Sequence, residues 1–265
     1  MKKFFLIINI FFIFIPQLKA TEFFENDEIK YIFKNQNING TLVVYDLKKD
    51  VFVGYNRERA EQQFYPASTF KIFNSLIGLE TESVRDVDEV FYKYDGKKVF
   101  LESWAKDSSL KYAIKVSQVP AYKELAKKIG LKSMKENIEK LNYGNKNIGT
   151  KVDSFWLHGP LKISAFEQIN LLTLLAQKKL PYNIKHQEEI ADITILEKGK
   201  DYVLHGKTGW ATNNIEIPIG WFVGWLETSD NIFIFATNID NPTAELLYKR
   251  EEIVRESFKK LNILN

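Results

Sequence analysis

The chain has 265 residues, of which 45% are hydrophobic and 14% aromatic, with 37 basic and 34 acidic side chains. This composition is typical of a globular protein and excludes an intrinsically disordered one. Because the sequence has no cysteine, it excludes disulfides, thiolate metal sites and a lipid-modified cysteine anchor, so the fold depends on its hydrophobic core.

The first twenty residues have the pattern of a secretory signal peptide. Two lysines precede an apolar run over residues 4–15, and Leu18-Lys19-Ala20 supplies a small-residue cleavage site. The run is short for a membrane span, although an uncleaved anchor is the alternative. We predict a signal peptide at 1–20 and a mature periplasmic chain at 21–265. Cleavage leaves 34 basic and 34 acidic residues, a balance that argues against a nucleic-acid partner.

The mature chain begins with the pattern of a β-hairpin. Strands are expected at 39–46 and 51–55, joined by a turn at Lys48-Lys49-Asp50, and an apolar helix follows Pro66. Helical periodicity then dominates, with helices expected at 110–116, 119–129, 134–141, 163–177 and 183–193.

The last third of the chain is rich in β-strand patterns. Strands are expected at 202–207, 219–227 and 232–238, with a turn at 212–214 and a closing helix at 244–261. Strands from both ends of the chain are expected to share one antiparallel sheet with helices packed on it. We therefore predict an α+β fold in a single catalytic domain, with a helical subdomain inserted at roughly 80–195.

Ser68 and Lys71 are the first candidates for chemistry. Residues three apart on a helix share a face, so the amine can take the proton of the hydroxyl and make it a nucleophile. Three other Ser-x-x-Lys pairs occur, and they lack the apolar helix that follows Lys71: Ser103/Lys106, Ser108/Lys111 and Ser257/Lys260. Burial in that helix is expected to lower the pKa of Lys71, because desolvation disfavours the ammonium. The alternative is a helix cap with a lysine that reaches solvent.

Three further motifs could complete such a site. Ser117-Gln118-Val119 falls at a helix junction, Tyr143-Gly144-Asn145 forms a turn, and Lys207-Thr208-Gly209 ends a strand. A Ser-Lys pair needs a second hydroxyl to relay protons, a cation to hold a substrate carboxylate, and backbone N–H groups for an oxyanion. Ser117 offers the hydroxyl, Lys207 the cation, and Trp210 a backbone N–H.

The order and spacing of these motifs resemble those of the serine β-lactamases and penicillin-binding proteins. Their particular forms are similar to the class D enzymes, the oxacillinases, and Tyr143-Gly144-Asn145 favours class D over class A. The resemblance runs from about residue 25 to the end of the chain. It also covers Phe155-Trp156-Leu157, Arg250 and the segment Trp221-Phe222-Val223-Gly224-Trp225.

The resemblance implies hydrolysis of the β-lactam ring of penicillin-type antibiotics, and so resistance, through an acyl-enzyme on Ser68. It implies that Lys71 carries CO2 as a carbamate (N-carboxylysine) and acts as the general base. Trp156 would donate its indole N–H to that carbamate, and Ser117 would relay a proton to the lactam nitrogen. No metal or other cofactor is implied, and the three histidines show no metal-ligand spacing.

The same resemblance implies how a β-lactam is bound. Lys207, Thr208 and Arg250 would hold the substrate carboxylate, although Lys249 and Arg255 compete with Arg250 for that role. The backbone N–H groups of Ser68 and Trp210, the latter after Gly209, would form the oxyanion hole. Three apolar side chains would contact the substrate and keep the lysine pocket dry: Phe70, Val119 and Leu157. His205 lies close to Lys207-Thr208-Gly209 in the sequence, and whether it contributes to the site is left open.

Two other functions share this fold. A penicillin-sensing receptor domain stays acylated, and a transpeptidase or carboxypeptidase of cell-wall synthesis acts on D-Ala-D-Ala peptides. The rate of deacylation separates both from a hydrolase. The expected partners are β-lactam small molecules, with no nucleic acid and no stable membrane insertion, for a monomer or a homodimer.

Overall fold

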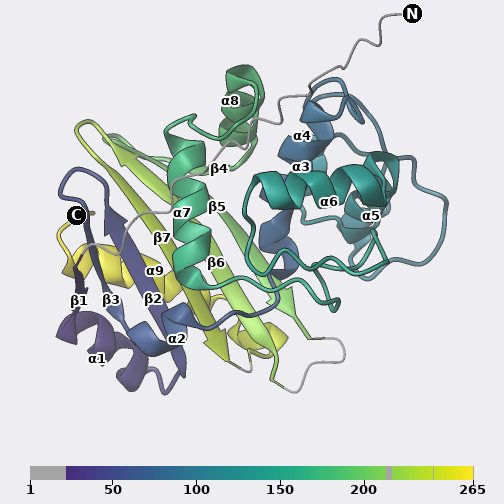
Figure 1. The fold of residues 1–265 in the computed structure, drawn as a ribbon. Coiled ribbons are helices and arrows are strands. Elements are labelled where there is room, and N and C mark those ends of the chain that lie inside the picture. Colours follow the sequence, from purple (N-terminus) through teal and green to yellow (C-terminus); the bar gives the residue numbers. More distant parts are fainter. Residues whose placement is uncertain (1–21, 213–216, 241, 265) are drawn as a thin grey trace, which may run out of the picture.

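A seven-stranded sheet forms the centre of the computed structural model, which describes residues 22–212, 217–240 and 242–264 (Figure 1). The strand order is β1-β3-β2-β7-β6-β5-β4. The strands are β1 Phe23–Glu25, β2 Gly40–Asp46, β3 Val51–Tyr55, β4 Ile195–Lys198, β5 Tyr202–Ala211, β6 Ile219–Thr228 and β7 Ile232–Asp240. Antiparallel pairing of β2 with β7 joins the two ends of the chain, which confirms the predicted sheet.

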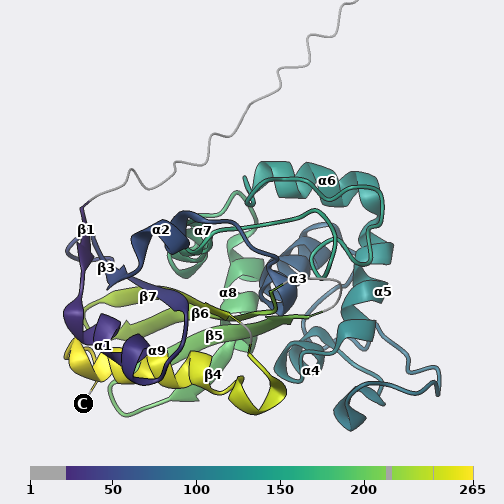
Figure 2. The ribbon, with the colours of Figure 1, turned by 90° about the horizontal axis from the view of Figure 1, so that it is seen from below.

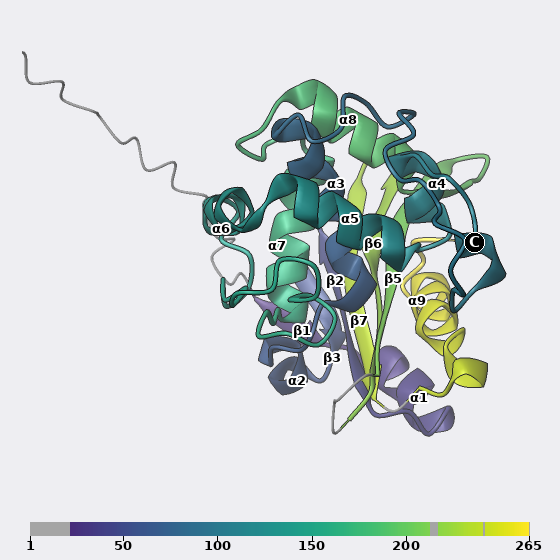
Figure 3. The ribbon, with the colours of Figure 1, turned by 90° about the vertical axis from the view of Figure 1, so that its right-hand side faces the viewer.

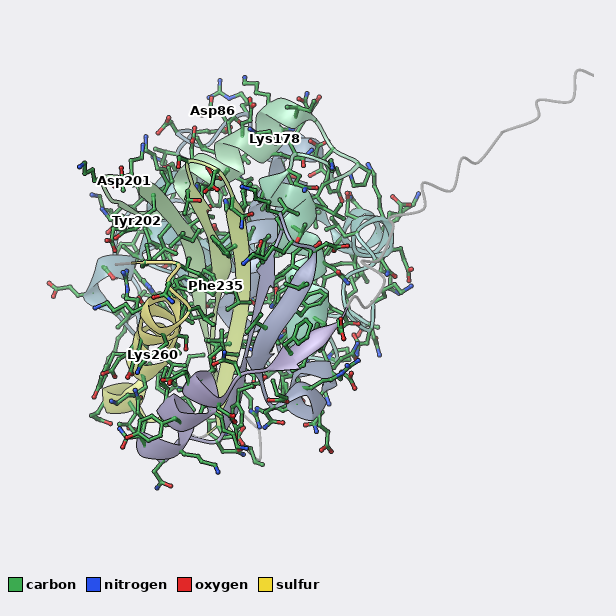
Figure 4. The ribbon with its side chains drawn as sticks, turned by 90° about the vertical axis from the view of Figure 1, so that its left-hand side faces the viewer. Asp86, Lys178, Asp201, Tyr202, Phe235 and Lys260 are labelled. Carbon is green, nitrogen blue, oxygen red and sulfur yellow. The ribbon has the colours of Figure 1, made fainter. Side chains whose placement is uncertain are left out.

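Two hydrophobic clusters cover the two faces of the sheet, because neighbouring strand residues point to opposite sides. Leu42 and Val44 belong to the cluster under α1 Asp27–Asn35 and α9 Lys249–Lys260, whereas Val43 belongs to the larger cluster on the other face. Phe235, labelled in Figure 4, packs against Phe258 of α9 with ring centroids 5.4 Å apart. Figure 2 shows the sheet between α1 and α9 on one side and α2 Arg57–Glu61 and α7 Ala165–Ala176 on the other.

A group of helices lies beside the sheet, nearest the viewer in Figure 3. It contains α3 Lys71–Glu80, α4 Leu110–Lys115, α5 Val119–Ile129 and α6 Leu131–Lys140, with α8 Ile184–Ile193 packed on α3 and α4. Short 3-10 turns lie at η1 Ala67–Phe70, η2 Glu102–Trp104 and η3 Ala244–Leu246. The helix α7 falls inside the range 80–195 predicted for the helical subdomain, yet it packs on the sheet. The limits of that subdomain stay a prediction.

Several elements differ from the sequence-based expectation. Lys207-Thr208-Gly209 lies inside β5 and not at a strand end, because β5 continues to Ala211 in register with β6. The closing helix is broken, so that α9 begins only at Lys249. The short elements β1, α1, α2 and β4 were not predicted, and β1 pairs with β3 in parallel. The predicted signal peptide and residues 213–214 of the predicted turn lie outside the described residues.

Candidate active site

Ser68 lies in the single turn of η1 that leads into α3. The residue before it, Ala67, adopts a left-handed backbone with φ +48°, which is strained for a residue with a Cβ. Hydrogen bonds hold this turn: Ala67 N donates to Trp156 O at 2.9 Å, and Thr69 Oγ1 donates to Pro66 O at 2.7 Å. These contacts fix the direction in which the Ser68 hydroxyl points.

The Lys71 amine lies in contact with both predicted hydroxyls. Its Nζ is 2.6 Å from Ser68 Oγ and 3.0 Å from both Ser117 Oγ and Ser117 O. Ser117 occupies the junction between α4 and α5 in a left-handed conformation with φ +54°, which turns its hydroxyl and its carbonyl toward the same amine. The structure therefore brings Ser68, Lys71 and Ser117 together as the sequence predicts.

Burial changes the acid–base character of Lys71. The side chain is fully buried, and burial lowers its pKa well below the ordinary value for lysine, with a further contribution from the positive charge of Lys207. A neutral amine has a free lone pair, so it can act as a base toward Ser68 or react with CO2.

Trp156 carries an unpaired hydrogen-bond donor beneath this turn. Its side chain is fully buried, and its indole N–H has no hydrogen-bond partner among the described residues. Its ring lies 5.8 Å from that of Phe70 and 5.0 Å from that of Phe155. Buried indole N–H groups normally find an acceptor. A carboxylate on the buried amine of Lys71 would supply one, so the residues present fit a carboxylated lysine.

Two cations meet on the other wall of the site, at β5 and α9. Lys207 is almost fully buried, and burial together with the charge of Arg250 lowers its pKa to about 7. Arg250 donates from Nη1 to Gly209 O at 2.9 Å, while its Nε has no partner among the described residues. Burial lowers the pKa of Arg250 to about 10, so it stays charged near neutral pH. Lys207 and Arg250 together can bind an anionic group of a ligand.

Of the competing cations, only Arg250 lies at this wall. Lys249 pairs with Glu252 at 2.7 Å, and Arg255 pairs with Glu197 at 2.8 Å. Likewise, the lysines of the three other Ser-x-x-Lys pairs lie at the surface, where Lys111 meets Asp88 at 3.3 Å and Lys260 meets Glu28 at 2.9 Å. The surroundings of each residue, and not the local pattern alone, separate the candidates.

The backbone of β5 offers N–H groups along an open edge. Gly206 N donates to Thr194 O on the side of β4, and β4 pairs with β5 only as far as His205. Because backbone groups alternate along a strand, the N–H of Trp210 points to the same edge, beyond the end of β4. Ser68 lies in the first turn of its helix, where N–H groups have no partner within the helix.

A close approach between β5 and η1 explains the glycine in Lys207-Thr208-Gly209. A Cβ at Gly209 would lie 3.0 Å from Pro66 O and 3.1 Å from Thr69 Cγ2. A side chain here would require the strand or the turn that carries Ser68 to shift by a few tenths of an ångström.

A cleft of about 440 Å³ opens between the two walls. Ser68, Ser117, Val119 and Leu157 line it on the helical side, and Thr208, Gly209, Trp210 and Arg250 line it on the β5 side. Phe70, which the sequence places with the substrate-contacting residues, is fully buried under the cleft and packs on Tyr143 and Phe155. Its apolar ring therefore shields the lysine pocket from below.

Sequence reasoning missed several residues of the cleft wall. Lys123 follows Val119 by one helical turn, so the i, i+4 spacing could have identified it. His158 has no sequence signal beyond its place after Leu157. His205 does not line the cleft: it stacks on Trp225 at 4.4 Å, its Nδ1 lies 2.9 Å from Ala191 O, and burial lowers its pKa.

The Tyr143-Gly144-Asn145 turn serves the architecture of the site. Tyr143 is fully buried against Phe70 and Phe73, at ring distances of 5.3 and 5.5 Å. Gly144 has φ +50°, and a Cβ there would lie 2.0 Å from Lys162 O. The turn thus supports the floor beneath the lysine pocket.

Within residues 22–212, 217–240 and 242–264, no helix is long and apolar enough to cross a membrane. The same part of the chain holds no group of three or more His, Cys, Asp or Glu side chains arranged to bind a metal ion.

Comparison with known proteins places this geometry in a family. The penicillin-binding protein transpeptidase domain matches residues 30–259. The β-lactamase OXA-48 of Klebsiella pneumoniae is 40% identical, over 92% of this chain and 92% of its own. The crystal structure of FUS-1 (OXA-85), a class D β-lactamase of Fusobacterium nucleatum subsp. polymorphum, is 63% identical. It has a TM-score of 0.90 over 91% of this chain and 100% of its own. That of the class D β-lactamase of Sebaldella termitidis is 37% identical, with a TM-score of 0.87 over 92% and 99%.

Proposed function

The chain belongs to the class D β-lactamases, and from this premise we propose that it opens the β-lactam ring of penicillin-type antibiotics through an acyl-enzyme on Ser68 and thereby confers resistance. The observation that carries the proposal is the buried amine of Lys71, 2.6 Å from Ser68 Oγ. A lysine without its positive charge at that place can activate the serine.

In the first half of the reaction, Ser68 Oγ gives its proton to the base at Lys71 and attacks the lactam carbonyl carbon. The N–H groups of Ser68 and Trp210 stabilise the negative charge on the carbonyl oxygen. Ser117 Oγ, 3.0 Å from Lys71 Nζ, passes a proton to the lactam nitrogen as the C–N bond breaks. An ester on Ser68 results. In the second half, water gives a proton to the same base and attacks that ester, and Ser68 Oγ takes the proton back as it leaves.

The second half needs a base that is stronger and better placed than a hydroxyl. CO2 held on Lys71 as a carboxylate would supply that general base, and the indole N–H of Trp156 would pair with it. Val119 and Leu157 line the approach to this pocket and Phe70 closes it below, so the three side chains restrict bulk water. Lys207, Thr208 and Arg250 hold the substrate carboxylate on the opposite wall.

Multiple turnover tests this function directly. Purified mature protein is mixed with a thousandfold excess of benzylpenicillin and bicarbonate, and ring opening is followed by absorbance. Loss of the whole substrate pool supports a hydrolase. Consumption of one equivalent, with no further reaction, contradicts it and favours a penicillin sensor or a transpeptidase.

We also propose export: residues 1–20 act as a cleaved signal peptide and deliver the enzyme to the periplasm, where β-lactams reach their targets. Mass spectrometry of protein from the periplasmic fraction tests this. An N-terminus at or near Thr21 supports cleavage, and a chain that keeps Met1 contradicts it.

The pH dependence should have two limbs. As pH falls, Lys71 takes up a proton and can no longer hold CO2, so kcat decreases on the acid side. As pH rises above about 7, free enzyme loses the Lys207 proton, so kcat/KM for benzylpenicillin should fall about 5-fold or more by pH 9. Steady-state rates from pH 5 to 9 measure both limbs. Lys207→Arg should remove the alkaline limb, because arginine stays protonated. An alkaline limb that persists in Lys207→Arg contradicts the assignment.

Gly209→Ala should disturb the oxyanion geometry without unfolding the protein. The added Cβ pushes β5 away from Pro66 O, so the N–H of Trp210 moves relative to Ser68. We expect kcat to fall about 10-fold, since a misplacement below 1 Å is costly in catalysis. Thermal unfolding controls for stability. An unchanged kcat in a folded variant contradicts the proposed role of this strand.

A further inference from the structure

Two side chains on the cleft wall are used neither by the proposed reaction nor by the fold. Lys123 lies on α5, four residues after Val119 and on the same face of the helix. His158 follows Leu157 in the loop on the same wall. In the part of the chain that the structure describes, neither side chain has a hydrogen-bond or ion-pair partner. Both therefore keep their donors for a ligand.

The two other lysines of α5 both have partners, whereas Lys123 has none among the described residues. Lys127 lies 3.7 Å from Asp153, and Lys128 donates to Phe91 O at 3.1 Å. Lys123 instead is partly buried in the cleft wall. Among the described residues that line the cleft, there is no aspartate or glutamate. The positive charge of Lys123 thus faces a cleft that offers no anion of its own.

The cleft carries cations on both of its walls. Lys207 and Arg250 lie on the β5 wall, where the proposed function assigns the carboxylate of the bicyclic ring system. Lys123 lies on the opposite wall, where the His158 imidazole, Val119 and Leu157 also line the cleft. One carboxylate cannot bind at both places, because the two groups of side chains lie on opposite walls of the cleft.

We propose that Lys123 and His158 form a second anion subsite, which binds a carboxylate on the acyl side chain of a β-lactam. The lysine supplies the charge, and the imidazole supplies an N–H donor in either protonation state. The inference rests on the proposed function, since it assigns the substrate class of the same cleft: β-lactams with two carboxylates, one on the ring system and one on the side chain.

Two penicillins that differ only in this group provide the test. Benzylpenicillin has one carboxylate, and α-carboxybenzylpenicillin has a second on its side chain. The measured quantity is the ratio of kcat/KM for the dianionic to the monoanionic substrate. Lys123→Gln should lower this ratio about 3- to 10-fold, as expected for a partly shielded ion pair, and His158→Asn should lower it less. Lys123→Glu should lower it further, because it places like charges together.

Lys132→Gln is the matched control, because it removes the same charge from a side chain that is 91% exposed and lies outside the cleft. It should leave the ratio unchanged. High salt should lower the ratio of the wild-type protein and have little effect on that of Lys123→Gln.

A merely structural role for Lys123 would change both substrates equally and leave the ratio alone. The inference is overturned if the ratio of kcat/KM for the two substrates is unchanged in Lys123→Gln, or if Lys132→Gln changes it by the same factor. Either result leaves hydrolysis of benzylpenicillin intact. Failure of the wild-type protein to turn over benzylpenicillin would instead overturn the proposed function itself, so the two failures are distinguishable.

Discussion

Replacing Lys71 by alanine is expected to lower kcat for benzylpenicillin by about 10³- to 10⁴-fold. The amine lies 2.6 Å from Ser68 Oγ and 3.0 Å from Ser117 Oγ, so its removal deprives both halves of the reaction of their base. Effects within such a unit are not additive, and a second change at Ser117 should add little. Stopped-flow and steady-state rates measure the loss, and the acyl-enzyme that does form should persist.

Lys111→Ala is the control for this variant, because it removes a lysine from another Ser-x-x-Lys pair. Its amine meets Asp88 at the surface, so kcat should stay within about twofold of the wild-type value. Thermal unfolding tells a catalytic loss from a folding defect. Lys71→Met, which fills more of the buried space than alanine, should fold and be as inactive as Lys71→Ala. Turnover near the wild-type rate in either Lys71 variant would contradict the assigned role.

Trp156→Phe is expected to lower kcat about 100-fold when bicarbonate is not added. The substitution keeps a buried aromatic ring against Phe70 and removes only the indole N–H, which has no partner among the described residues. Without that donor, CO2 should dissociate from Lys71 more readily, and the acyl-enzyme should accumulate. Added bicarbonate should restore part of the activity.

A matched indole elsewhere in the core controls for the change in packing. Trp225 is also fully buried, and its N–H donates to Glu227 Oε1 at 2.8 Å, on the part of the sheet beside His205. Trp225→Phe should change stability without making kcat depend on bicarbonate. Equal bicarbonate dependence in the two variants would contradict the role given to Trp156.

Local patterns were sufficient to predict the hairpin, the helices around the site and the motif residues. The helix after Pro66 is an unbroken apolar run and the helix 119–129 has strong helical periodicity, and Ser68, Lys71 and Ser117 meet as expected. Local patterns predict an element correctly where the apolar residues of that element determine which of its faces is buried. The fold class followed from strands at both ends of the chain.

Other features depend on contacts between distant parts of the chain, which no local pattern records. The choice of Arg250 over Lys249 and Arg255 depends on where α9 meets β5. The extension of the Lys207 strand to Ala211 depends on its pairing with β6. The position of Phe70 beneath the cleft and that of His158 on its wall depend on how residues 141–164, between α6 and α7, pack against the rest of the chain.

The most direct test of the central claim is intact-protein mass spectrometry of the mature enzyme mixed with benzylpenicillin, followed over time with and without bicarbonate. The expected result is an adduct of one penicillin, absent in Ser68→Ala, that clears within the first turnovers and clears faster when bicarbonate is present. An adduct that persists for hours under both conditions, or one that forms equally in Ser68→Ala, would contradict a hydrolase that acts through Ser68 and a carboxylated Lys71.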